Sequence, residues 1–259
     1  VIEYSSRVME IVVEMRLGAA VRLLRLSLGL LLLLLPTLCS SPVFPTHPSF
    51  LPQTFRARGP DGEKQHFYIR QVPGDGACLF HAVAVCLRHK ESLGCHPDFD
   101  AEMEKLSRRL RKISVSYLSR DNCTLVMEGD ERTTTTSLLQ TVAEHYNMTP
   151  ERYCGQMRLT HTWGGGPEIV AISNFLRRPI HVYELESTTS SGLGYLSGRR
   201  CFQLKVTACF GAPYFNDKSP LYLLCADGRF PHIDPGDERE IGDHFLALLP
   251  CGDSSLRRR

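Results

Sequence analysis

The chain has 259 residues, of which 42% are hydrophobic and 22% are charged, a balance that suits one globular domain with an additional segment. Its formal net charge of +2 at pH 7 excludes a general electrostatic attraction to nucleic acid, so we predict no nucleic-acid partner. One group of basic residues falls within a helical pattern and is expected to form a solvated face: Arg108, Arg109, Arg111 and Lys112.

The chain has ten cysteines, and their spacing decides how they are interpreted. No two of them follow the Cys-x-x-Cys pattern, and the intervals between them fit neither a zinc site nor a compact disulfide framework. We therefore expect most of them to be reduced, buried thiols, and we predict no metal site.

The N-terminal segment has the layout of a secretory signal. From Met15 onward, three arginines precede an apolar run from Leu26 to Leu35, and small residues follow at 39–41. Residues 1–41 are therefore interpreted as lying outside the fold. Three interpretations stay open for them: a targeting signal, a signal anchor that contacts the membrane, or a mistaken translation start.

The predicted domain boundaries follow from composition. Residues 42–65 contain five prolines, which disfavour both helix and central strand, and are predicted to be a linker. The folded domain is expected over residues 66–250, and residues 251–259 form a basic tail.

The predicted elements place helices first and strands last. Residues 66–72 are expected to form a short strand, and a helix follows from Cys78 to about Lys90. Apolar spacings of three and four then predict helices over 103–117, 137–146, 149–157 and 166–176, the third with Thr149 as its cap and Pro150 in its first turn. The threonine tract at 133–136 is interpreted as a loop.

The last predicted helix should bury Ile169, Ile172, Phe175 and Leu176. Beyond it the pattern is typical of strands, over 179–185, 201–208, 220–226 and 244–250. This order predicts an α+β domain whose sheet comes largely from the C-terminal half.

A glycine-rich turn precedes the first helix, in the stretch PGDGACLF at 73–80. Its glycines permit a tight turn that delivers the Cys78 thiol to a helix N-terminus, where a cysteine becomes reactive. The backbone N–H groups of Asp75, Gly76, Ala77 and Cys78 are candidates for holding a developing oxyanion. On these residues alone, Cys78 is either a nucleophile or a structural cysteine behind a glycine turn.

Two further stretches add to this turn: TWGGGPEIVAISNFLRRPIHVYE at 162–184 and DHFLALL at 243–249. In order and spacing, the three together resemble the OTU (ovarian tumour) deubiquitinases, papain-like cysteine peptidases that cleave ubiquitin. The resemblance covers roughly residues 66–250. It implies a papain-like OTU fold with a small, mostly antiparallel sheet packed between helices.

The resemblance also implies roles for individual residues. Cys78 matches the family's nucleophile, Asp75 matches an aspartate of the catalytic set, and His244, followed by Phe245, matches the base. The residues that match the family's W-G-G segment and the acidic residue after it are expected to shape the wall of the substrate cleft: Trp163, Gly164, Gly165 and Glu168.

The chain departs from the family pattern at two positions. Ala77 stands where many members have Asn or Arg before the nucleophile, which removes a polar contact but keeps the backbone N–H. Leu246 stands where many members have an Asn or Asp that orients the histidine. The His244 imidazole is then expected to be oriented by Asp75, by Asp243 or by a backbone carbonyl.

Other histidines and one acidic stretch are weaker candidates. His81 should point away from the reacting face or into packing, His161 should be a polar surface residue, and His181 should face solvent from its strand. Residues 227–238 lack the ligand spacing of an EF-hand and are interpreted as a hairpin loop. The Asn122 and Asn147 sequons matter only in a secreted chain.

The function that the resemblance implies is thiol-dependent hydrolysis of isopeptide bonds at the C-terminal glycine of ubiquitin, through a Cys78 thiolate and a His244 imidazolium, without metal or cofactor. The implied partners are ubiquitin, polyubiquitin chains and ubiquitinated proteins, with the helices between 97 and 160 as the contact region. Two alternatives stay open, a weak or inactive ubiquitin-binding protein and a lumenal protein with disulfides. We expect a monomer whose catalytic domain faces the cytosol, whereas residues 15–41 point toward the endoplasmic reticulum or another organelle.

Overall fold

The computed structural model describes residues 55–60, 62–91, 100–189, 200–228, 230 and 242–251. The segment predicted as a targeting signal and nearly all of the basic tail lie outside these residues, as does most of the loop at 227–238. No helix in the described ranges is long and apolar enough to cross a membrane.

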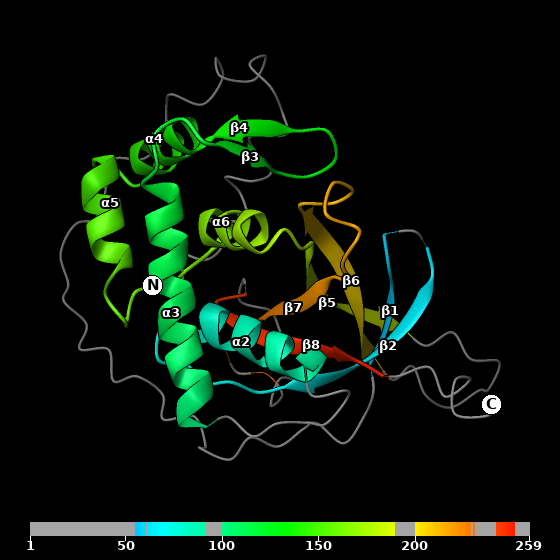
Figure 1. The fold of residues 1–259 in the computed structure, drawn as a ribbon. Coiled ribbons are helices and arrows are strands. Elements are labelled where there is room, and N and C mark those ends of the chain that lie inside the picture. Colours follow the sequence, from blue (N-terminus) through cyan, green and yellow to red (C-terminus); the bar gives the residue numbers. More distant parts are fainter. Residues whose placement is uncertain are drawn as a thin grey trace, which may run out of the picture.

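The main sheet of the described chain closes into a barrel in the order β1-β2-β8-β7-β5-β6 (Figure 1). Antiparallel pairing dominates, but β7 pairs with β5 in parallel, and β1 meets β6 in parallel at Ala57 and Leu204. The strands are β1 (Phe55–Arg58), β2 (Lys64–Arg70), β5 (Ile180–Thr189), β6 (Arg200–Phe210), β7 (Leu221–Ala226) and β8 (His244–Pro250).

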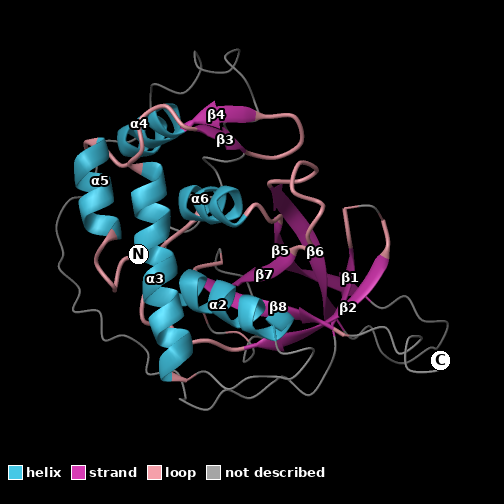
Figure 2. Ribbon diagram, viewed as in Figure 1, coloured by secondary structure: helices cyan, strands magenta, loops and turns pink. Residues whose placement is uncertain are grey.

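The helices gather on one flank of the barrel (Figure 2). The first described helix packs against β8 and β7, and the next one packs against it and against the last helix. A two-stranded hairpin, β3 (Thr124–Val126) with β4 (Arg132–Thr134), lies above α6 in the figures. The helices are α2 (Cys78–Glu91), α3 (Ala101–Leu118), α4 (Thr135–His145), α5 (Pro150–Met157) and α6 (Gly166–Leu176).

Burial explains why β7 and β8 read as continuous apolar runs. Every residue of β7 is buried, and so is every residue of β8 up to Leu249, because α2 covers one face and the barrel interior covers the other. His244 is therefore the first residue of a fully buried strand.

The predicted α+β class and the predicted helices are confirmed. α6 spans the residues predicted for it, and the Thr149 side chain accepts a hydrogen bond from the Arg152 N–H at the start of α5, with Pro150 in the first turn. The four C-terminal strands are also present where they were predicted.

Three predictions about the elements are wrong. The sheet begins at Phe55, so the linker predicted to end at residue 65 contains β1 and the start of β2. The tract 133–136 is no loop, because Thr134 ends β4 and caps α4 by accepting from the Ser137 N–H. Phe175 is 44% exposed because it lies on the outer face of α6, where its ring meets Tyr117 edge to face.

Two charged or polar residues predicted to face solvent are buried. Arg111 is 3% exposed and turns into the molecule between α3 and the loop before α6. His181 is also buried, with its ring edge against Tyr222. By contrast, His161 is exposed, as predicted, and Arg108, Arg109 and Lys112 lie on the outer face of α3.

Seven cysteines in the described part of the chain are free, and most of these seven are buried. This agrees with the reduced thiols that their spacing predicts. The free cysteines are Cys78, Cys86, Cys123, Cys154, Cys209, Cys225 and Cys251.

Candidate active site

The loop before α2 takes a conformation that only glycine adopts easily at position 76. Gly76 has a φ of +87°, and a Cβ on it would overlap the backbone carbonyl of His161. The loop that joins α5 to α6 is therefore packed directly beneath the turn that delivers Cys78. Glycine at this position follows from two requirements at once, a left-handed turn and a close approach of two backbones.

Cys78 and the start of β8 meet, although they are far apart in the sequence. Cys78 is the first residue of α2, and its Sγ accepts a hydrogen bond from the Phe245 N–H at 3.5 Å. Phe245 directly follows His244, so the two residues predicted as nucleophile and base lie in the same buried region. Cys78 is 0% exposed and His244 is 2% exposed.

Burial keeps both groups neutral in this conformation. Desolvation raises the pKa of the Cys78 thiol to about 12, against hydrogen bonds from the Phe245 and Leu79 backbone that lower it. Desolvation also lowers the pKa of His244 to about 4. A neutral thiol and a neutral imidazole are thus favoured at pH 7 in this conformation, in place of the thiolate and imidazolium that the sequence predicted.

His244 is oriented by main chain and framed by an aromatic ring. Its imidazole is hydrogen bonded to the Val72 backbone, which is one of the three orienting contacts expected from the sequence. Trp163 stands edge-on to it, with the ring centroids 6.5 Å apart. The position of the family's Asn or Asp, Leu246, is fully buried in β8.

Asp75 makes contacts that the sequence analysis did not anticipate. Its Oδ1 accepts from the Ala77 N–H at 2.9 Å, and both of its carboxylate oxygens lie within 3.2 Å of His81 Nε2. Burial alone would raise the pKa of Asp75, but the His81 contact and the Ala77 N–H hold it below its usual value. His81 therefore turns back toward the nucleophile loop.

These contacts narrow the set of oxyanion donors. The Ala77 N–H already donates to Asp75, so among the four predicted donors it is engaged within its own loop. The Cys78 N–H lies in the first turn of α2, where backbone N–H groups have no acceptor within the helix. Of these two N–H groups, that of Cys78 is therefore the better candidate to hold an oxyanion near the Cys78 sulfur.

Arg111 is the functional candidate that sequence reasoning missed. Its guanidinium donates to the Gly76 carbonyl at 2.9 Å, to the carbonyl of Met157 at the end of α5, and to those of Thr160 and Thr162 in the α5–α6 loop. It also lies over the Phe80 ring, 4.4 Å from the centroid. The spacing of residues in α3 could have indicated that Arg111 is buried. Arg111 lies three or four residues from Ser107, Ser114 and Val115, which share the buried face of the helix.

The residues predicted to shape the cleft wall lie against α2 and α6. A Cβ on Gly164 would meet Leu79 and Phe80 at 3.0 Å, so this residue lets the loop approach α2 closely. Glu168 is fully buried, and it accepts from the Gly165 N–H and the Tyr153 hydroxyl, each at 2.8 Å. Desolvation raises the pKa of Glu168. Glu168 thus fixes the start of α6, while Trp163 is the member that contacts His244.

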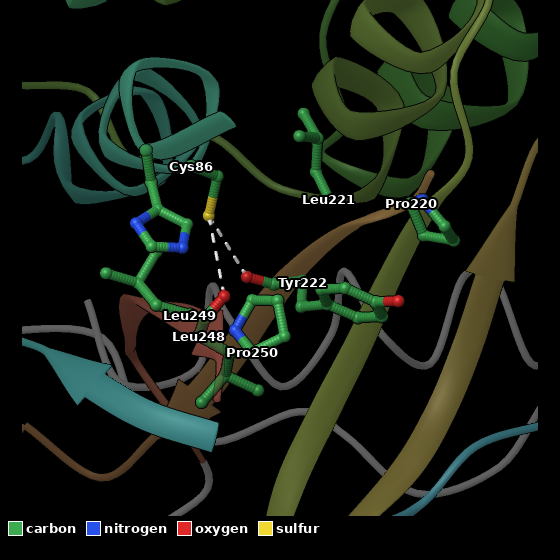
Figure 3. Close-up of a pocket in the computed structure, with 8 residues that line it drawn as sticks. Cys86, Pro220, Leu221, Tyr222, Leu248, Leu249 and Pro250 are labelled. Carbon is green, nitrogen blue, oxygen red and sulfur yellow. Dashed lines mark hydrogen bonds between the residues drawn. The ribbon is translucent and has the colours of Figure 1, made fainter. Parts of the chain in front are cut away.

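A small hollow lies elsewhere, farther along α2 (Figure 3). Cys86, Tyr222 and Leu248 are among its lining residues, and it leaves no room for a water molecule. The Cys86 Sγ points to the Tyr222 carbonyl at 3.2 Å, which anchors α2 to β7. The described residues contain no group of three or more His, Cys, Asp or Glu side chains able to hold a metal ion.

Comparison with known proteins adds a family to this geometry. The family model described as OTU-like cysteine protease matches residues 73–205. Ovarian tumor domain-containing deubiquitinating enzyme 4 of Arabidopsis thaliana is 32% identical over 125 residues, which are 45% of this chain and 31% of that protein. The chain therefore matches about a third of the length of this curated relative.

Two solved structures are similar at low identity. An ovarian tumor (OTU) domain in complex with ubiquitin is 16% identical with a TM-score of 0.38, over 76% of each chain. The Hazara virus OTU bound to ubiquitin is 18% identical with a TM-score of 0.39, over 72% of this chain and 83% of that one. The family model covers more than half of the chain and includes the loop from Asp75 to Cys78, so the chain belongs to the OTU-like cysteine proteases.

Proposed function

We propose that the protein is a thiol-dependent deubiquitinase that hydrolyses isopeptide bonds at the C-terminal glycine of ubiquitin. The observation that carries this proposal is the contact between the Cys78 sulfur and the Phe245 N–H, which brings the helix-borne thiol to the strand that begins with His244. Family membership supports it. The Arabidopsis relative is named a deubiquitinating enzyme.

The chemistry uses two residues in turn. His244, neutral at rest, takes the proton from the Cys78 thiol as the sulfur attacks the carbonyl carbon of the terminal glycine. The carbonyl π electrons move to oxygen, and the Cys78 N–H stabilises the oxyanion. As the tetrahedral intermediate collapses, the C–N bond breaks and the imidazolium protonates the departing lysine amine, which leaves a thioester on Cys78.

Water then completes the cycle. His244 takes a proton from the water that attacks the thioester, the carbon–sulfur bond breaks, and the sulfur recovers a proton from the imidazolium. Ubiquitin leaves with a free carboxylate, and Cys78 is again a thiol. Asp75 serves this scheme by shaping the loop through Ala77 and by its electrostatic effect on His244, which raises the pKa of the imidazole.

Labelling with an electrophilic ubiquitin tests the proposal. The full chain is incubated with ubiquitin that carries a vinyl methyl ester in place of its C-terminal glycine, and the adduct is located by mass spectrometry. We expect an adduct on Cys78 that disappears in Cys78→Ala and is strongly reduced in His244→Ala. Cys86→Ala is the matched control, because Cys86 is a second buried thiol of α2, and labelling should survive this change. An unlabelled wild-type chain that is folded by circular dichroism would falsify the proposal.

Two observations favour a second candidate, a ubiquitin-binding protein without activity. Leu246 fills the position of the family's polar orienting residue, and a neutral, buried thiol has low intrinsic reactivity. Such a protein would bind ubiquitin in a titration yet form no adduct on Cys78. The labelling experiment, run beside a binding measurement, therefore separates the two candidates.

We also propose that the chain acts as a monomer and that residues 15–41 set its location, including any contact with a membrane. Light scattering of the purified chain tests the first point, with a mass near 29.2 kDa as the expected result. Imaging the tagged full chain beside a chain that starts at Ser41 tests the second. The same distribution for both chains would overturn the role given to residues 15–41.

A further inference from the structure

The peptide group that joins Gly76 to Ala77 is held at both of its polar ends. On one side, the Ala77 N–H donates to Asp75, whose carboxylate is in turn held by the buried imidazole of His81 at 3.0 Å. On the other side, the Gly76 carbonyl accepts from Arg111 Nη2 at 2.9 Å. The two contacts come from different helices, His81 from α2 and Arg111 from α3.

Arg111 is itself held in place by its surroundings. It is nearly fully buried, and its two Nη groups also donate to the carbonyls of Met157, at the end of α5, and of Thr160 and Thr162 in the loop that follows. Its Cζ lies over the Phe80 ring. A guanidinium is planar and presents its donors in a fixed fork, so its position fixes that of the carbonyls it binds. The backbone of Gly76 packs against that of His161 in the α5–α6 loop. Arg111 also links Gly76 to this loop, because it donates to the carbonyls of both Gly76 and Thr160.

The held peptide lies one residue before the proposed oxyanion donor. A peptide group is rigid and planar, so fixing its oxygen and its N–H fixes the whole plane. Only the two backbone torsions of Ala77 then separate this plane from the N–H of Cys78, and α2 begins at that residue. The direction of the Cys78 N–H therefore depends on the orientation of the Gly76–Ala77 peptide.

We propose that Arg111 is a positioning residue for catalysis. Arg111 holds the carbonyl end of the 76–77 peptide, and His81, through Asp75, holds its N–H end. Together they orient this peptide so that the Cys78 N–H points at the developing oxyanion. This inference rests on the proposed deubiquitinase function. Neither Arg111 nor His81 touches the reacting atoms.

The test compares two reactions of the same sulfur. Hydrolysis of a ubiquitin C-terminal aminocoumarin amide passes through an oxyanion, whereas alkylation of Cys78 by chloroacetamide does not. The variant is Arg111→Lys, which keeps the positive charge but loses the planar fork. We expect kcat for hydrolysis to fall roughly 10²-fold, the order of effect for losing one oxyanion-hole donor, because the Cys78 N–H is no longer aligned. KM and the alkylation rate constant should each stay within about threefold, the size of effect left for small changes in access and packing.

The matched control is Arg58→Met, which removes an exposed cation on β1 at the outside of the barrel. It should leave kcat, KM and alkylation unchanged. His81→Gln provides a second variant that weakens the opposite end of the same peptide, and it carries the test if Arg111→Lys does not fold. Because both residues act on one peptide plane, the kcat losses in the double variant should be less than multiplicative.

Each outcome decides the matter. A loss of kcat with alkylation preserved supports the inference. Equal losses in both reactions would show that Arg111 only stabilises the fold, and an unchanged kcat would show that it does not align the donor; either result overturns the inference while the proposed function stands. A wild-type chain that does not hydrolyse the ubiquitin substrate overturns the proposed function and this inference with it.

Discussion

Gly76, two residues before Cys78, is required by the geometry of the backbone. Gly76 combines a positive φ with a backbone contact to His161, whereas Gly62, in the β1–β2 turn, has a φ of +84° and nothing within 4 Å of the place where a Cβ would lie. A side chain at Gly62 would cost only torsional strain, whereas a side chain at Gly76 would cost torsional strain and an overlap with backbone atoms.

Alanine at these two positions should give different losses of stability. Gly62→Ala is expected to lower the free energy of unfolding by about 1 kcal/mol, which is the cost of a left-handed residue with a side chain. Gly76→Ala adds an overlap with main chain that cannot move aside and should cost at least about 2 kcal/mol more. Urea unfolding of both variants measures the difference, and equal losses would contradict the close approach of the two loops.

The buried imidazole of His244 predicts a dependence of stability on pH. Its pKa is lowered from 6.5 to about 4, so between these values the unfolded chain binds a proton that the folded chain does not. Stability therefore rises with pH across this window and is lost as pH falls from 6.5 toward 4, by on the order of 3 kcal/mol.

The measurement is the difference in unfolding free energy between wild type and His244→Gln, taken at several pH values. Glutamine does not titrate, so subtraction removes the contributions that both proteins share, including those of Asp75 and Glu168. We expect the wild-type chain to lose stability relative to the variant as pH falls from 6.5 to 4. A difference that does not change with pH would show that His244 is accessible to protons in the folded state.

Among the elements, α6 depends on one buried carboxylate at its first turn. Glu168 accepts from the Gly165 N–H and from the Tyr153 hydroxyl of α5. Burial raises its pKa, and the nearby Arg111 charge opposes this rise. Removing it leaves two buried donors without an acceptor.

Glu168→Ala should therefore cost about 3 kcal/mol of stability, the cost of leaving two buried donors unpaired. Glu151 is the matched comparison, because it is also an acidic residue in the first turn of a helix, α5, but is exposed. Glu151→Ala should leave the free energy of unfolding almost unchanged, because solvent screens its charge. Chemical denaturation of both variants provides the test, and losses of similar size would mean that the burial of Glu168 has no energetic weight.

The sequence predicted the elements better than it predicted the contacts between them. α5 and α6 carry their own start signals, Thr149 with Pro150 and Gly166 with Pro167, so local physics was sufficient. β1 was missed because four residues in a proline-rich stretch carry little periodic signal, and it forms a strand only by pairing with β2 and β6. Phe175 was misplaced because an apolar residue near a helix end need not face the core.

In the candidate site too, the sequence predicted which residues take part better than it predicted their contacts. Cys78 and His244 were identified by separated motifs, and the structure brings their chain segments together. The turn of His81 toward Asp75 and the burial of Arg111 depend on tertiary packing, which places carbonyls of one loop around a guanidinium. The neutral state of the thiol has the same origin, because desolvation by the whole fold outweighs the helix N-terminus.

For the molecule as a whole, closure of the barrel depends on β1. Phe55 and Ala57 are buried, and the Phe55 ring meets Phe230 edge to face at 6.2 Å. A chain that starts at His66 loses this strand and exposes the edges of β2 and β6. Its melting temperature should lie roughly 5–10 °C below that of a chain starting at Ser41, since losing one buried phenylalanine alone costs about 3 kcal/mol.

Thermal unfolding of the two chains at one concentration checks this expectation. Phe55→Ala in the longer chain isolates the contribution of the aromatic ring and should give a large part of the same decrease. Identical melting of the chains starting at Ser41 and His66 would mean that β1 contributes nothing to the barrel.

The position of β8 has a consequence for how the protein is made. The sulfur of Cys78 accepts a hydrogen bond from an N–H that lies 167 positions later in the sequence. In the barrel, β8 lies between β2 and β7, which are both synthesised before it. A chain emerging from the ribosome thus exposes its thiol long before its histidine exists. Joining segments so distant slows folding, so hydrolytic competence should appear only after β8 has left the ribosome.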